Sequence, residues 1–133
     1  MSAPHGMGPP IRRKKPRRKT SEQDFQRQVA EYLGEPVRAL PANAWFTSIP
    51  AGWGSMTKVP GYRAGTPDVL VIDRGLPIWL ELKVEGREPS DEQEQCRDDL
   101  IAAGCKWVLV RTLEDVERAL RRFAVPLRAT VAA

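Results

Sequence analysis

One stretch decides the fold of this chain, and it reads GTPDVLVIDRGLPIWLELK from Gly65 to Lys83. It holds two apolar runs, residues 69–72 and 76–84, on either side of an Asp-Arg-Gly break. This pattern is typical of a β-hairpin whose loop is Arg74-Gly75. A three-residue loop with a bulge is the alternative, and it would shift the pairing of the strands by one residue.

The two-residue loop places Asp68 directly opposite Glu81. Side chains opposed on one face of a sheet have Cβ atoms roughly 4.5–5.5 Å apart, and like charges there repel each other. Because side chains alternate along a strand, Lys83 shares the face of Glu81, whereas the leucines between and beside them point to the other face. Two carboxylates and one ammonium group therefore meet at the open end of the hairpin. A divalent cation between the carboxylates would turn their repulsion into ligation.

The same residues also have a purely structural explanation. Thr-Pro-Asp at 66–68 is common in turns, and Glu-x-Lys at 81–83 suits the exposed face of a strand. Short motifs of this kind recur by chance, so their context in the chain has to decide between the two explanations.

The positive charge of the chain is concentrated at one end. Its 133 residues include 21 basic and 17 acidic side chains, for a net charge of +4. Seven basic residues and no acidic ones lie in the first 19 positions, which leaves 14 basic and 17 acidic residues, or −3, for the remainder. Residues 1–20 have too few apolar side chains to form a core, so we expect a disordered arm that binds phosphate backbones. A nuclear-import signal and a solubilising tail are the alternatives. The expected contacts are Arg12, Arg13, Lys14, Lys15, Arg17, Arg18 and Lys19.

The composition excludes several kinds of site. The only cysteines are Cys96 and Cys105, and the only histidine is His5. These are too few for a zinc cluster, and no serine–histidine–aspartate triad fits them. Two cysteines without a signal peptide favour a cytoplasmic protein, or a nuclear one in a eukaryotic host, over a secreted one. No apolar run approaches the roughly 18 residues of a membrane span.

A helix is expected to start at about Ser21 and to end at Leu33, before Gly34. Its apolar stripe includes the position of Glu22. An acid in the first turn is favourable beside the positive end of the helix dipole, which would explain Glu22 without any function. The functional alternative is that Glu22 reaches the carboxylates of the hairpin.

A short strand at 45–49 and a glycine-rich loop at 51–63 are expected next. A loop of this length inside a small domain is usually functional or mobile. Its Lys58 and Arg63 lie shortly before Asp68, and we expect them to hold the phosphate backbone of a nucleic acid.

The sequence Ser-x-x-Gln at 90–93 is a capping box, which opens a helix that ends at Gly104. The same helix points Gln93 inward, so Gln93 is expected both to cap the helix and to touch the site. A buried strand at 106–111 then completes a βαβ unit with the strand at 76–84, and the two strands should be parallel.

A last helix is expected to start at Thr112, and Pro126 is expected to end the ordered region. The folded domain would therefore span 21–125, followed by a tail at 126–133. The predicted order is helix, strand, hairpin, helix, strand, helix. This is an α/β fold with a small mixed β-sheet flanked by helices.

Taken together, these motifs resemble the PD-(D/E)xK nucleases, and specifically their VRR-NUC branch, the virus-type replication–repair nucleases. The resemblance covers about residues 21–123 and implies a restriction-endonuclease-like αβββαβ core. It rests on the helix with Glu22, on Gly-x-Pro-Asp at 65–68, on Glu-x-Lys at 81–83 and on Ser-x-x-Gln at 90–93.

The resemblance implies Mg²⁺- or Mn²⁺-dependent hydrolysis of phosphodiester bonds in DNA, in replication, recombination or repair. Small stand-alone members tend to be homodimers that act on branched DNA such as four-way junctions, as Holliday-junction resolvases do. Lys83 would act on the attacking water or the transition state, and Gln93 would position Lys83 or the water. The implied metal ligands are Asp68, Glu81, the Leu82 backbone carbonyl and Glu22, the last directly or through a water.

Two alternatives stay open beside an active DNA endonuclease. A non-catalytic nucleic-acid-binding or scaffold protein would keep the fold, although such a protein has no reason to retain opposed carboxylates. A nuclease that acts on RNA or single strands would share the site and differ only in substrate. The chain also departs from the family at Ala51, where the similar segment has asparagine.

Overall fold

The computed structural model describes residues 21–50 and 59–131. They form one four-stranded sheet in the order β1-β2-β3-β4, in which β3 and β4 are parallel and the other neighbours antiparallel. This confirms the predicted α/β fold with a small mixed sheet. The elements are α1 (Glu22–Leu33), β1 (Trp45–Ser48), β2 (Val69–Asp73), β3 (Leu76–Leu82), α2 (Asp91–Ala102), β4 (Lys106–Val110) and α3 (Leu113–Arg122).

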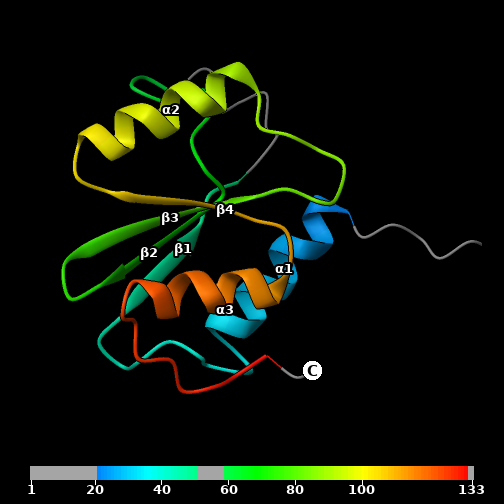
Figure 1. Cartoon of the computed structure of the whole chain (residues 1–133), viewed down its shortest axis with the longest axis vertical. Coiled ribbons are helices and arrows are strands. Elements are labelled where there is room, and N and C mark those ends of the chain that lie inside the picture. Colours follow the sequence, from blue (N-terminus) through cyan, green and yellow to red (C-terminus); the bar gives the residue numbers. More distant parts are fainter. Residues whose placement is uncertain (1–20, 51–58, 132–133) are drawn as a thin grey trace, which may run out of the picture.

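The helices cover the two faces of the sheet unequally. Helices α1 and α3 lie together on one face, and α2 lies alone on the other (Figure 1). The hydrophobic core lies on the α1/α3 face, where alternate residues of β2 and β3 are fully buried: Val69, Val71, Ile78, Leu80 and Leu82. By contrast, α2 buries only Cys96 among its own residues. The polar residues of the hairpin therefore lie on the more thinly covered face.

The register of the hairpin is the one that a two-residue loop requires. Val69 pairs with Leu80, so Asp68, one residue earlier, comes opposite Glu81. The loop residues Arg74 and Gly75 both have positive φ, 49° and 79°, as a type I′ turn demands. Arginine is not a favoured residue there. Its side chain is held, however, by hydrogen bonds to Asp73 and to the backbone carbonyl of Ala124.

The predicted helix starts are confirmed by their caps. Ser21 and Ser90 each accept a hydrogen bond from the backbone N–H three residues later, and both complete a capping box. Thr112 caps α3 in the same way through its hydroxyl. Each cap satisfies a backbone donor that the first turn of a helix leaves without an intrahelical partner.

Two expectations about the C-terminal third of the chain are wrong: that the strand at 106–111 is buried, and that Pro126 ends the ordered region. Strand β4 lies at the edge of the sheet, and of its residues only Val110 is buried. The ordered region also continues past Pro126. The hydroxyl of Tyr32 donates to the carbonyl of Ala129 at 2.8 Å, and Arg128 donates to the carbonyl of Leu40 at 3.0 Å. The segment after α3 thus packs against α1 and the loop that follows it, contacts that a proline-based boundary cannot reveal.

Gly65 lies where the chain enters the hairpin from the long loop. It has a φ of +86°, and a Cβ built on it would lie 2.3 Å from the carbonyl oxygen of Glu92 in the first turn of α2. Only glycine permits this approach, which fixes Asp68 close to the start of α2.

Gly65→Ala is expected to lower the free energy of unfolding by about 2–4 kcal/mol, because backbone strain and a backbone clash add. Urea denaturation measures the loss. The matched control is Gly86→Ala, because Gly86 has the same φ of +86° but nothing within 4 Å of its Cβ position. It should lose only about 1 kcal/mol. Equal losses in the two variants would show that the contact with α2 is unimportant.

Candidate metal-binding site

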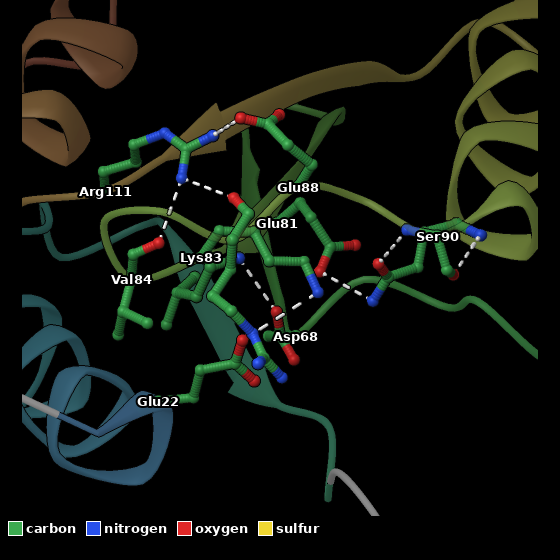
Figure 2. A network of polar contacts seen from close by, with 11 residues as sticks. Glu22, Asp68, Glu81, Lys83, Val84, Glu88, Ser90 and Arg111 are labelled. Carbon is green, nitrogen blue, oxygen red and sulfur yellow. Dashed lines mark hydrogen bonds and ion pairs between the residues drawn. The ribbon is translucent and has the colours of Figure 1, made fainter.

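Asp68 is fixed against β3 by both its backbone and its side chain. Its N–H donates to the carbonyl of Leu80 at 3.2 Å, and its Oδ2 accepts a hydrogen bond from the N–H of Leu82 at 2.8 Å. Asp68 thus extends the hydrogen bonding between the two strands to the residue before β2. This places it beside Glu81, as Figure 2 shows.

Glu81 is a buried carboxyl group, with only 1% of its surface exposed. Its Oε2 accepts a hydrogen bond from the side chain of Gln93 at 3.2 Å, whereas its buried Oε1 has no hydrogen-bond partner among the described residues. Burial, followed by the charge of Asp68, raises the pKa of Glu81 to about 9. Without a cation, Glu81 therefore keeps its proton at neutral pH, which removes most of the repulsion from Asp68.

Lys83 follows the end of β3, and only 12% of its side chain is exposed. Its Nζ lies 3.9 Å from Oε1 of Glu22, which stands on the first turn of α1 and is 45% exposed. Glu22 thus reaches the amine. In the described part of the chain no three acidic, histidine or cysteine side chains are close enough to hold an ion together. The donors that converge are the carboxylates of Asp68 and Glu81, and Glu22 lies beside Lys83.

Gln93 has the double contact that its position in the sequence predicts. Its N–H donates to Oγ of Ser90 at 3.2 Å, and its Oε1 accepts from the N–H of Ser90 at 2.9 Å. The remaining amide nitrogen donates to Glu81. One side chain therefore closes the N-terminus of α2 and fixes the orientation of the buried carboxyl group.

Gln26 belongs to the surroundings of this site, although the sequence did not single it out. Its side-chain nitrogen donates to the carbonyls of Ile49 and Asp68, at 3.2 and 3.3 Å. It ties α1 to the end of β1 and to the residue that bears a site carboxylate. Its spacing of four residues from Glu22 is a signal that both side chains share one helix face.

The candidates for DNA contact are only partly described. Arg63 forms an ion pair with Asp99 of α2, which lowers the pKa of that carboxyl group. The arm residues 12–19, Ala51 and Lys58 lie outside the described residues. The structure therefore places Arg63 on the α2 side of the sheet and leaves the other contacts as predictions.

An open cleft of about 1060 Å³ adjoins the site, between α1, residues 84–86 and the start of α3. Asp68 and Glu81 do not line it, so the cleft does not enclose the carboxylate pair. Its lining includes three acidic residues, Glu85, Glu114 and Asp115, against one basic residue, Arg111, beside apolar and neutral polar side chains. An acidic lining disfavours a phosphate backbone, so we do not expect DNA to run through this cleft.

Solved structures with a similar fold are known. One, described as "VRR_NUC domain protein", aligns over 80% of this chain and 89% of its own with a TM-score of 0.62 and 21% identity. The chain has the VRR-NUC fold. A second, described as "VRR_NUC domain", covers 77% of this chain and 92% of its own with a TM-score of 0.50 and 20% identity. No family model and no curated protein matches the sequence.

The VRR-NUC fold accounts for the αβββαβ order seen here and agrees with the resemblance drawn from the motifs. In this chain the fold brings the Pro-Asp, Glu-x-Lys and Ser-x-x-Gln residues to one end of the β2–β3 hairpin. None of the helices in the two described ranges is long and apolar enough to cross a membrane.

Proposed function

We propose that the chain is a divalent-cation-dependent nuclease that hydrolyses phosphodiester bonds of DNA. The observation that supports this most strongly is the pairing of Asp68 with the buried Glu81. The two acids lie side by side, Asp68 just before β2 and Glu81 on β3, and burial together with the charge of Asp68 raises the pKa of Glu81 to about 9. Such a pair lowers the stability of the metal-free protein, and it is explained by a cation that both carboxylates bind.

The residues present fit Mg²⁺ or Mn²⁺. Both prefer oxygen ligands, and the pair offers hard carboxylate oxygens, among them Oε1 of Glu81, which no described residue hydrogen-bonds. The backbone carbonyl of Leu82 would complete the protein ligands, and Glu22 would act through a water. When bound, the cation supplies positive charge and Lewis acidity at the scissile phosphate.

The side chains of Lys83, Glu22 and Gln93 would assist the hydrolysis itself. Hydrolysis forms a bond between a water oxygen and phosphorus and breaks the bond from phosphorus to one sugar oxygen. The ammonium of Lys83 would orient the water or stabilise the charge on the phosphate oxygens in the transition state. Glu22 would hold Lys83 in place, and Gln93 would orient Glu81.

We propose branched DNA such as a four-way junction as the substrate, and a homodimer as the active form, by analogy with small VRR-NUC proteins. The folded part carries −3, so it repels DNA at long range. The basic arm, with Lys58 and Arg63, would then supply most of the attraction. A cytoplasmic or nuclear location follows from the proposed substrate.

Metal binding tests this proposal without any assumption about the DNA. In a thermal melt, Mg²⁺ or Mn²⁺ at about ten times its Kd should raise the Tm by about 5 °C relative to EDTA. Asp68→Asn keeps an acceptor for the N–H of Leu82 but should lose this rise. The control Asp98→Asn, on the exposed side of α2, should keep it. If the unaltered protein shows no rise, a non-catalytic nucleic-acid-binding or scaffold protein is favoured instead.

Deletion of residues 1–19 should weaken DNA binding and leave metal-dependent cleavage intact at saturating protein. Seven cations lie in this segment. Each phosphate contact contributes about 0.9 to the slope of log K against log salt, so the slope should fall by several units if most of them bind. Titrations of a four-way junction between low and moderate salt measure it. An unchanged slope would show that the arm does not contact DNA.

A further inference from the structure

The segment between Lys83 and Ser90 joins the two halves of the site but has little structure of its own. Residues 84–89 belong to no helix or strand, and residues 85–88 are exposed. Within them the described structure has one backbone hydrogen bond, from the N–H of Arg87 to the carbonyl of Val84 at 3.2 Å. Such a segment would be free to move unless something outside it holds it.

Arg111 holds this segment at three points. One terminal nitrogen, Nη1, donates to the carbonyl of Val84 at 3.0 Å and to that of Arg87 at 2.6 Å. The other, Nη2, donates to Oε1 of Glu88 at 2.9 Å. Figure 2 shows the guanidinium between Val84 and Glu88, at the edge of the site. Both terminal nitrogens are thus directed at protein oxygens, which argues against a role in binding phosphate.

Arg111 is itself fixed by the rigid corner between β4 and α3. Its N–H donates to Oδ2 of Asp115 at 2.9 Å. The residue before it, Val110, is fully buried and accepts a hydrogen bond from the N–H of Lys83 at 3.1 Å. The guanidinium therefore connects a buried part of the sheet to an exposed segment, and no other side chain in the described ranges makes comparable hydrogen bonds to that segment.

We propose that Arg111 is a positioning residue for the cleavage reaction, an inference that rests on the function proposed above. By fixing residues 84–88, it fixes Lys83 at one end of the segment and the Ser90–Gln93 cap at the other. Both ends contact the carboxylate site, through Glu22 and Glu81. A displacement of about 1 Å in a catalytic group lowers the rate by about 10²-fold. Arg111 thus acts on the rate of the chemical step without touching DNA or the cation.

Arg111→Lys is the sharpest variant, because it keeps the positive charge but replaces a planar fork with a single ammonium that cannot bridge all three oxygens. Single-turnover cleavage of a four-way junction at saturating protein and Mg²⁺ should slow by about 30- to 100-fold. The Kd for the same DNA should stay within about twofold. The control is Arg121→Lys on α3, whose partner Glu117 lies 2.9 Å away, and it should cleave normally. A full rate in Arg111→Lys, or equal losses of rate and affinity, would overturn the proposal.

Hydrogen exchange in EDTA tests whether Arg111 holds residues 84–88, and it needs no measurement of cleavage. The amide protons of Lys83 and Arg87 should exchange about tenfold faster in Arg111→Lys than in the unaltered protein or Arg121→Lys, with little change in the Tm. Unchanged exchange would show that Arg111 does not hold this segment, and it would overturn the proposal even if cleavage slowed. Failure of the unaltered protein to cleave any DNA would instead overturn the proposed function, and with it the catalytic part of this inference.

Discussion

Lys83→Ala is expected to cleave DNA about 10³-fold more slowly than the unaltered protein, while it folds normally and binds DNA with similar affinity. In the proposed reaction the ammonium group would lie where charge develops, and loss of one such electrostatic contact typically costs 10²- to 10³-fold in rate. Its one ion pair within residues 21–50 and 59–131 is long, 3.9 Å to the half-exposed Glu22. Such a pair contributes little to stability, so the variant should remain folded.

The measurement is single-turnover cleavage of branched DNA with Mn²⁺, beside a binding titration in EDTA. Lys106→Ala is the matched control, because it removes an exposed lysine at the start of β4, where its amine lies over the ring of Phe123. That variant should cleave at the normal rate. If both lysine variants were fully active, Lys83 would have no part in the chemistry. Retained metal stabilisation with lost cleavage would place its role after metal binding.

The pairing at the centre of the site was accessible from sequence because it depends on local geometry. A two-residue loop and the alternation of a strand fix which side chains oppose each other, and no long-range information is needed to place Asp68 beside Glu81. The capping box at Ser90 works in the same way over three residues. The direction of the Gln93 side chain toward the site follows from helix periodicity.

The supports of the site were not accessible, because each depends on where distant segments meet. Arg111 reaches residues more than twenty positions earlier, and only after β4 has paired with β3. Gln26 bonds to Ile49 and Asp68 from another layer of the fold. The close contact of Gly65 with Glu92 depends on the placement of α2. No periodicity marks such contacts, which explains why sequence patterns indicate the candidate site residues better than the residues that hold them in place.

Glu81→Gln is expected to abolish cleavage and to make the metal-free protein more stable at neutral pH. The pKa of Glu81 lies at about 9 in the folded chain, above its ordinary value of 4.5. The folded state therefore binds the proton more tightly than the unfolded state. The stability that this proton contributes is complete below pH 4.5 and is lost as the pH rises to about 9. Glutamine stays neutral throughout, so the variant should be more stable at pH 7 by on the order of 3 kcal/mol.

Urea denaturation in EDTA at pH 5, 7 and 9 measures this difference, which should widen as the pH rises. Other carboxyl groups, such as Asp115 and Glu117 with lowered pKa values, titrate alike in both proteins and cancel in the comparison. The exposed Glu85→Gln is the control and should follow the unaltered protein. Added Mg²⁺ should stabilise only the protein that retains Glu81, because the variant lacks the carboxylate that would bind the cation in exchange for its proton. Parallel pH profiles in EDTA would show that Glu81 is ionised without metal, and the buried carboxyl pair would then need another explanation.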